Sequence, residues 1–146
     1  MAKGYPDFYG FSIWPKYGAV MTDNVIGGVA VDGADTLVHL LVGKGRITGG
    51  VFRLRWCADW RFVWPIITVD GNILTPEIGV PGFITWYGAD CSGYPVNLKS
   101  YTGPLGSCSW DYVKDYVFND SFQVIIHNNS GIAGDIHSYL NYALMQ

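Results

Sequence analysis

The stretch Ile66-Ile67-Thr68-Val69-Asp70-Gly71-Asn72-Ile73-Leu74 carries the clearest structural signal in this chain. β-Prone residues stand on both sides of an Asp-Gly pair. Such a pair supplies the positive φ angles of a type I′ turn, whose twist matches that of the strands it joins. The stretch therefore predicts a β-hairpin that turns at Asp70-Gly71.

The rest of the chain has the same character. Gly, Pro, Asn and Asp interrupt it at intervals of roughly 8 to 12 residues, with β-branched and aromatic runs between them, as in an all-β sandwich or barrel. We expect strands at Val25–Val31, Thr36–Val42, Arg46–Trp56, Phe62–Val69, Asn72–Ile78, Gly82–Trp86, Phe118–His127 and Ile136–Leu144, and short edge strands at Val20–Met21 and Val96–Leu98. One short helix is expected at Ser109–Val117, where Trp110, Val113 and Val117 follow a helical spacing.

The strand expected at Arg46–Trp56 contains a break in its alternation. Ile47 is odd-numbered, but Phe52, Leu54 and Trp56 are even-numbered, and Gly49-Gly50 stands between them. A β-bulge adds one residue to a strand and often contains glycine. We therefore predict a bulge at Gly49-Gly50 that returns the apolar side chains to one face.

The strand expected at Thr36–Val42 is apolar on both faces. Strict alternation would place Leu37 and Leu41 on one face, and Val38, Leu40 and Val42 on the other. Both faces must then be covered. A loop or a neighbouring subunit would cover the outer one, so we predict that Val38, Leu40 and Val42 belong to a subunit interface.

Composition places the chain among globular proteins. Hydrophobic residues make up 49% of its 146 residues and aromatic residues 16%, which excludes disorder. The length suits a single domain over residues 1–146. Charged residues are only 14%, against about 25% in an average domain. This low charge indicates a surface that is covered by other subunits or binds neutral ligands such as sugars.

Charge and hydropathy also limit the partners. The net charge of −3 argues against a nucleic-acid partner. No apolar run approaches the length of about 20 residues that spans a membrane, so we expect no membrane insertion. Residues 1–14 lack the apolar core of a secretory signal, and we expect synthesis in the cytoplasm without a signal peptide.

Patterns for catalysis or metal binding are weak. The spacing of Cys57, Cys91 and Cys108 fits no zinc site. Cys91 and Cys108 could form a disulfide or remain free thiols. His39, His127 and His137 stand on three different expected strands, and the last two could approach one another. We expect no enzymatic activity, no metal and no cofactor.

All four arginines lie between residues 46 and 61, and Arg53 and Arg55 share one face of one expected strand. Guanidinium groups bind carboxylates and phosphates bidentately, so this face could be an anion site or could contact an acidic partner. Alternatively, the arginines pair with Asp residues on an outer sheet face. We include Arg53 and Arg55 in the predicted interface.

Aromatic residues gather in the longest stretches without clear strands. If the protein binds neutral glycans, we expect the site among Trp86, Tyr87, Tyr94, Trp110 and Tyr112. Exposed Trp and Tyr offer flat apolar faces with a polar edge for sugar rings. The alternative is that these rings pack against the core or a neighbouring subunit.

Three segments, residues 37–52, 65–73 and 118–128, together resemble strands of jelly-roll virion structural proteins of tailed bacteriophages and archaeal viruses. They are also distantly similar to the jelly roll of difructose-anhydride-type glycoside hydrolases. The resemblance implies a single jelly-roll β-sandwich of about eight strands. It does not carry over the hydrolase activity, because Glu77 is the only glutamate available to match the catalytic ones.

The resemblance implies a viral structural protein, in a capsid, turret, decoration or fibre, that assembles as a homo-oligomeric trimer or pentamer beside other virion proteins. We therefore expect the protein in the virion. The alternative function is a carbohydrate-binding β-sandwich module, which includes a receptor-binding component of the same kind of virion. A small enzyme is a third, weaker alternative.

Overall fold

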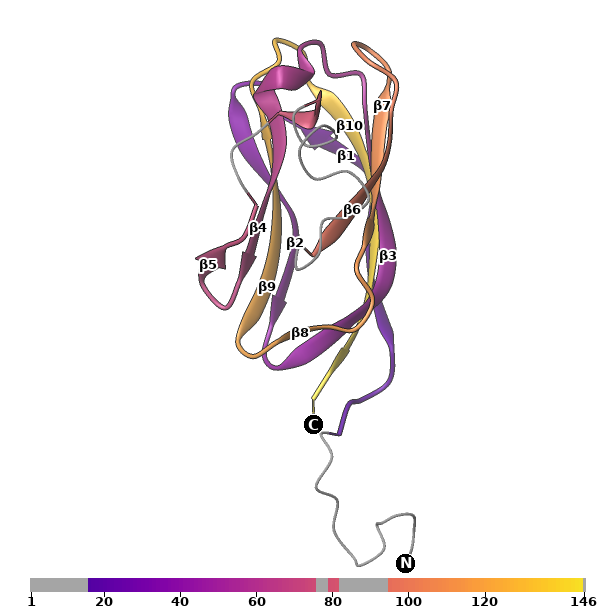
Figure 1. Cartoon of the computed structure of the whole chain (residues 1–146), viewed down its shortest axis with the longest axis vertical. Coiled ribbons are helices and arrows are strands. Elements are labelled where there is room, and N and C mark those ends of the chain that lie inside the picture. The colour runs from indigo at the N-terminus through magenta and orange to yellow at the C-terminus, as the bar shows by residue number, and fades with distance from the viewer. Residues whose placement is uncertain (1–15, 76–78, 82–94, 146) are drawn as a thin grey trace, which may run out of the picture.

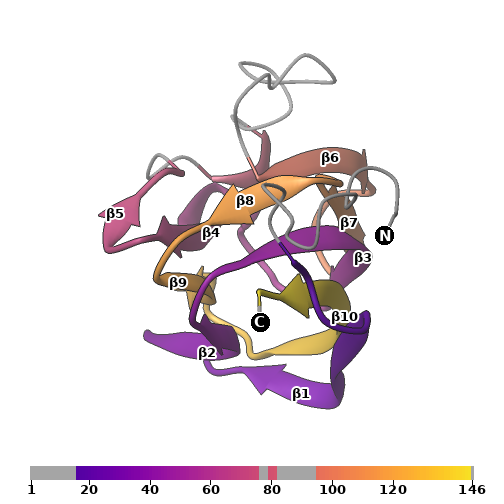
Figure 2. The same ribbon diagram turned by 90° about the horizontal axis from the view of Figure 1, so that it is seen from below.

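The computed structural model describes residues 16–75, 79–81 and 95–145, which form a sandwich of two β-sheets (Figures 1 and 2). Its strands are β1 (Met21–Ala30), β2 (Ala34–Val42), β3 (Gly45–Arg55), β4 (Val63–Val69), β5 (Asn72–Ile73), β6 (Val96–Tyr101), β7 (Ser107–Tyr112), β8 (Tyr116–Phe118), β9 (Ser121–Asn128) and β10 (Gly134–Leu144). A single 3₁₀ turn, η1 (Trp60–Phe62), precedes β4. Among the described residues, no helix is long and apolar enough to cross a membrane.

The order of the strands is that of a jelly roll. One sheet has the order β1-β10-β3-β7-β6, with β8 also pairing with β3, and the other has the order β2-β9-β4-β5. Every pairing is antiparallel. The chain passes from one sheet to the other between β1, β2, β3 and β4, which interleaves two Greek keys. The predicted fold class, an all-β jelly-roll sandwich, is confirmed.

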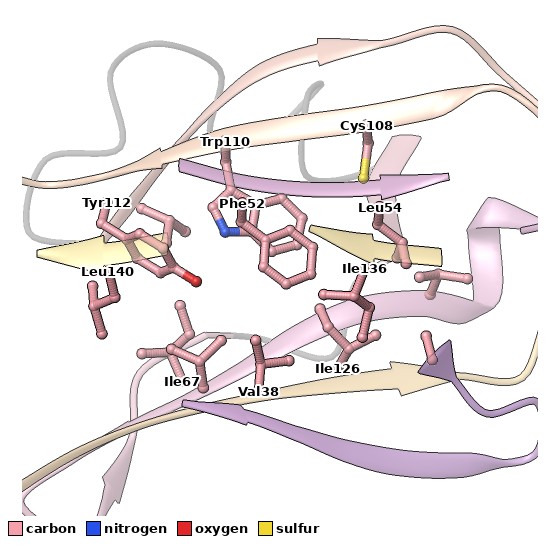
Figure 3. Close-up of a cluster of buried hydrophobic side chains, with 14 of the residues drawn as sticks. Val38, Phe52, Leu54, Ile67, Cys108, Trp110, Tyr112, Ile126, Ile136 and Leu140 are labelled. Carbon is pink, nitrogen blue, oxygen red and sulfur yellow. The ribbon is translucent and has the colours of Figure 1, made fainter. Parts of the chain in front are cut away.

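The core lies between the two sheets and is rich in aromatic side chains (Figure 3). Phe52 on β3 stacks on Trp110 on β7, with ring centroids 4.1 Å apart. Ile67 and Ile126 face them from the other sheet. Along β9 every second side chain is buried, as its alternating sequence predicts.

The turn between β4 and β5 is the predicted type I′ turn. Asp70 has a φ of 53° and Gly71 a φ of 83°, both positive as this turn requires. The carboxylate of Asp70 also accepts hydrogen bonds from the backbone N–H groups of Asn119, Asp120 and Ser121. These bonds hold the β8–β9 turn and lower the pKa of Asp70.

β3 contains a bulge, as predicted, but the bulge lies directly before the predicted position Gly49-Gly50. Tyr142 pairs with Ile47 and Asn141 pairs with Gly49, so that Thr48 is the additional residue. Beyond it, Phe52 and Leu54 point into the core, as Ile47 does, but the prediction is wrong for Trp56, which follows the end of β3 and is 49% exposed. Gly50 has a φ of 134°, and a Cβ there would collide with the carbonyl oxygen of Tyr139. Glycine at position 50 is therefore required by a close approach of two strands.

The helix predicted at Ser109–Val117 is wrong. The segment forms the end of β7, a turn in which Asp115 has a φ of 62°, and β8. Trp110 and Tyr112 point inward with the period of two that a strand imposes. Pairing of β7 with β3 and β6 outweighs the helical spacing of three apolar residues.

The prediction of which β2 side chains point outward is also wrong in part. The pairing with β9 shifts between Leu37 and His39, so Val38 occupies a bulge and both Val38 and His39 are buried. Leu37, Leu40 and Val42 consequently share the outer face. Val38 is therefore a core residue and is not available for a subunit interface, whereas Leu40 and Val42 remain exposed.

Two of the expected strands fall wholly or partly on residues outside the described ranges. Gly82–Trp86 lies wholly outside them. Of the strand expected at Asn72–Ile78, the structure shows β5 over Asn72–Ile73, and residues 76–78 are outside the described ranges. The short edge strands are found as the start of β1 at Met21 and as the longer β6.

Candidate functional site

The predicted glycan site is not assembled from the described residues. Trp110 and Tyr112 are each only 2% exposed and form part of the core. Their rings have no face free for a sugar, so the alternative of core packing is correct for both. Trp86, Tyr87 and Tyr94 lie outside the described residues.

A buried chain of four polar side chains links the two sheets. His39 Nδ1 lies 2.6 Å from Asp23 Oδ2, and His39 Nε2 lies 2.7 Å from Ser138 Oγ. Ser138 Oγ in turn lies 3.0 Å from the hydroxyl of Tyr112. The four residues come from β2, β1, β10 and β7, so the chain connects strands that are distant in sequence.

The direction of these hydrogen bonds follows from a neutral His39. The Tyr112 hydroxyl donates to Ser138, the Ser138 hydroxyl donates to Nε2, and Nδ1–H donates to the Asp23 carboxylate. A proton on Nε2 would make this nitrogen a donor, so the Ser138 hydroxyl could no longer donate to it. Burial lowers the pKa of His39, although the Asp23 carboxylate acts in the opposite direction. Burial is the larger effect, so the neutral imidazole is favoured.

Ser138, His39 and Asp23 have the order of a nucleophilic triad, but their position serves the fold. The Ser138 residue is 3% exposed and its hydroxyl points into the core, where it also contacts Tyr112. Nucleophilic catalysis requires a substrate carbonyl near this oxygen and donors for the developing oxyanion. Core side chains fill that space. This chain of hydrogen-bonded side chains thus joins edge strands β1 and β2 to the interior.

The other two histidines lie on opposite outer faces. His127 on β9 stacks on Trp64, with ring centroids 4.1 Å apart, and contacts Asp35 at 2.7 Å. His137 on β10 contacts Asp135 at 3.0 Å. The expectation that the two histidines could approach one another is therefore wrong. Within the described part of the chain, no group of three His, Cys, Asp or Glu residues is placed to hold a metal ion.

Cys57 and Cys108 are buried free thiols. Burial raises the pKa of Cys57 to about 11 and that of Cys108 well above its ordinary range. Because the thiolate is the reactive form, these two groups are chemically inert at neutral pH. Of the two alternatives for Cys108, the structure has the free thiol. Cys91 lies outside the described residues.

Three of the four arginines pair with aspartates, as one of the two alternatives predicted. Arg46 pairs with Asp115 at 3.2 Å, Arg61 pairs with Asp59 at 2.8 Å, and Arg55 pairs with Asp135. Within residues 16–75, 79–81 and 95–145, Arg53 has no acidic partner. It points outward near the end of β3.

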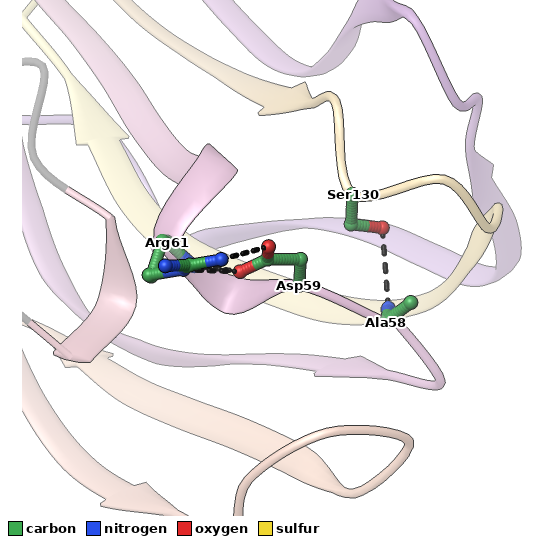
Figure 4. Close-up of polar contacts among 4 residues, drawn as sticks. All are labelled: Ala58, Asp59, Arg61 and Ser130. Carbon is green, nitrogen blue, oxygen red and sulfur yellow. Dashed lines mark hydrogen bonds and ion pairs between the residues drawn. The ribbon is translucent and has the colours of Figure 1, made fainter.

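The end of the sandwich that lies uppermost in Figure 1 is held together by contacts between its loops. Figure 4 shows that the Ala58 N–H donates to Ser130 Oγ, and that the Asp59 carboxylate accepts from the Arg61 side chain. Beside them is a cleft of about 470 Å³, whose walls include Trp60, Tyr101 and Pro104. Because Asp59 and Arg61 neutralise one another, this cleft presents mainly apolar surface.

The outer face of the sheet β2-β9-β4-β5 is unusually apolar. Five of its apolar side chains, Leu37, Leu40, Val42, Ile66 and Ile125, are here called the apolar face, and Trp64 and Ile73 lie on the same side of the sheet. Leu37 pairs with Ile125, and Ile125 pairs with Ile66, so the three side chains form one row across three strands. Leu37, Leu40 and Val42 are 52%, 49% and 70% exposed. The sequence pattern identified Leu40 and Val42 but missed Ile66 and Ile125, since a row requires the strand register.

Comparison with known proteins adds no assignment to these sites. No protein-family model matches the chain, and no curated protein matches it.

Proposed function

We propose that the protein is a structural subunit that assembles into a closed homo-oligomer through the apolar face. The observation that carries the proposal is the row Leu37–Ile125–Ile66, beside which Leu40 and Val42 follow along the edge strand β2, paired with Gln123 and Ser121 of β9. Contiguous exposed apolar patches on otherwise polar proteins mark interaction sites. A second copy of the chain is the occupant proposed here.

Burial of this face would provide a useful free energy of association. Full burial of a Leu or Val side chain is worth about 1.5–3 kcal/mol, and Leu37, Leu40 and Val42 retain roughly half of that surface. Each residue would thus add about 1 kcal/mol per subunit. Ile66 and Ile125 lie half-buried between their neighbours and would form the centre of the contact.

The contact is made by side chains and not by strand addition. β1 and β2 are the edge strands on the same side of the sandwich, side by side in Figure 2. Each contains a register shift, at Gly27 in β1 and at Val38 in β2. Bulges of this kind hinder pairing of an edge strand with another chain. The sheet face therefore remains the available surface.

The jelly-roll topology and the low charge support the more specific proposal of a virion component, in a capsid, turret, decoration or fibre. A closed trimer or pentamer would bury one apolar face per subunit and leave the opposite sheet facing outward. In such a ring the apolar face would contact a different surface of the next copy, and closure prevents this contact from propagating into a filament. The chain's partners would then be its own copies and other virion proteins.

The test is the oligomeric state of matched variants. Leu37→Lys with Leu40→Lys places two cations on the apolar face, and Val117→Lys makes the same chemical change at an exposed residue of the other sheet. Light scattering after size exclusion should give an oligomer for the wild type and Val117→Lys, and a monomer for the double variant. Electron microscopy of the oligomer should show closed rings. A wild-type monomer at micromolar concentration would contradict the proposal.

A further inference from the structure

The outer face of the other sheet contains a groove of about 290 Å³. Two rows of three side chains line it, each crossing β1, β10 and β3. The register places Ile26, His137 and Arg53 in one row, and Asn24, Tyr139 and Val51 in the next. The groove thus combines an arginine, a histidine, an amide and a phenol with two aliphatic side chains.

The charges around this groove favour an anion. Arg53 has no acidic partner within the described residues. In the neighbouring row, the Asp135 carboxylate accepts from both Arg55 and His137. Arg55 and Asp135 therefore neutralise one another, which leaves Arg53 as the unpaired arginine of this region. A ligand carboxylate would give Arg53 the partner that the other three arginines already have.

We propose that this groove binds an acidic sugar, a pyranose with a ring carboxylate of the hexuronate type. The guanidinium of Arg53 presents parallel N–H groups that match both oxygens of the carboxylate. The side-chain amide of Asn24 and the hydroxyl of Tyr139 can bond to sugar hydroxyls. Ile26, Val51 and the Tyr139 ring supply apolar surface for the C–H face of the sugar.

The size of the groove agrees with a single sugar unit. A cavity of about 150 Å³ holds a benzene molecule, so 290 Å³ accommodates a six-membered ring with its substituents. A stable protein partner would instead cover about 800 Å² on this side. The site lies on the face opposite the apolar face, and its occupancy is independent of the proposed assembly.

The test uses calorimetric titration of the intact protein with methyl β-glucuronide and, in parallel, methyl β-glucoside. These ligands differ in the carboxylate. We expect the glucuronide to bind at least tenfold more tightly, and Arg53→Gln to remove that preference, since loss of a charged bidentate contact costs a factor of ten or more. Arg61→Gln is the matched control, an exposed arginine at the other cleft, and should leave binding unchanged.

A second variant tests the site without altering Arg53. Ile26 is 78% exposed, and Ile26→Asp would place a carboxylate at the rim without disturbing the core. We expect it to weaken glucuronide binding and to leave the oligomeric state unchanged. The proposal is overturned if neither sugar binds, if both bind equally, or if Arg53→Gln retains the preference. It is also overturned if an acidic peptide binds through Arg53 more tightly than the glucuronide, because the site would then belong to a protein partner.

Discussion

His39 and Asp23 join edge strands β2 and β1 of the sandwich, with 2.6 Å between Nδ1 of the imidazole and Oδ2 of the carboxylate. The imidazole is buried, whereas the Asp23 side chain is 43% exposed. One end of the buried polar chain therefore reaches solvent at the β1–β2 edge. Protonation of His39 would add a proton at Nε2 and would therefore act on the contact with Ser138 at the buried end of this chain.

The first prediction concerns the stability of the fold at acidic pH. The pKa of His39 lies below its ordinary value of 6.5 in the folded protein, so the unfolded chain takes up this proton at higher pH. The free energy of unfolding should therefore fall as the pH decreases below about 6.5. Thermal unfolding from about pH 7.5 to about pH 5 should show this loss for the wild type. His39→Gln should remove most of the dependence, whereas His137→Gln, on the outer face, should retain it.

The pH range in which His39 affects stability is separate from the range in which the carboxylates do. The pKa values of Asp70 and Asp135 are lowered from 3.8, by backbone N–H donors for Asp70 and chiefly by Arg55 for Asp135. Their contributions are present above that value and are lost only as the pH falls through and below it. An equal slope for wild type and His39→Gln between about pH 7.5 and pH 5 would contradict the role given to His39.

The second prediction concerns the carboxylate of Asp70. Asp70→Asn keeps a residue suited to the type I′ turn and removes the charge that accepts three backbone hydrogen bonds. Because the group is exposed, we expect a loss of only about 1 kcal/mol in the free energy of unfolding, measured in urea. Asp120→Asn changes the same charge in the adjacent turn and should have little effect. Equal losses for both variants would attribute the effect to net charge.

The third prediction compares two neighbouring glycines. Gly49 and Gly50 both have positive φ angles, but only at Gly50 would a Cβ collide with backbone, whereas at Gly49 it would meet Lys114 at 3.9 Å. Gly49→Ala should cost about 1 kcal/mol from backbone strain, and Gly50→Ala about 2–4 kcal/mol because two strands must separate. Urea unfolding of both variants measures the difference. A larger loss at Gly49 would place the close approach elsewhere.

The fourth prediction separates Val38 from Leu40, which alternation placed on the same face. Val38 is in the core, so Val38→Ala should reduce the free energy of unfolding by about 1–3 kcal/mol. Leu40 is outside, so for the isolated subunit Leu40→Ala should change it by less than about 0.5 kcal/mol. Under the proposed assembly, Leu40→Ala should instead weaken the oligomer. Equilibrium sedimentation with chemical unfolding distinguishes these effects, and a stable Val38→Ala variant would speak against the bulge.

Features that depend on a few consecutive residues could be predicted from the sequence. The Asp70-Gly71 turn follows from the φ angles that Gly allows and Asp tolerates. The β3 bulge follows from a break in alternation beside two glycines. Most strands, and hence the sandwich, follow from a period of two that holds wherever one face of a sheet is buried.

Other features were decided by pairing between distant segments. Ser109–Val117 has a helical spacing, yet β3 and β6 pair with β7 and impose the strand. The bulge at Val38 reverses the facing of β2 beyond it, and no glycine marks it in the sequence. Wherever the register shifts, pairing with the neighbouring strand determines whether a side chain points into the core or outward.

The candidate sites belong to this second group. The polar chain through His39 joins residues on four strands, and the apolar face becomes continuous only when β2, β9 and β4 lie in register. The sequence by itself determined an all-β chain with a tight hairpin and a bulged strand, because these depend on local backbone geometry. The tertiary structure alone decided that Arg53 lacks an acidic partner within the described residues while Arg55 has Asp135, because charge pairing depends on which strand lies alongside.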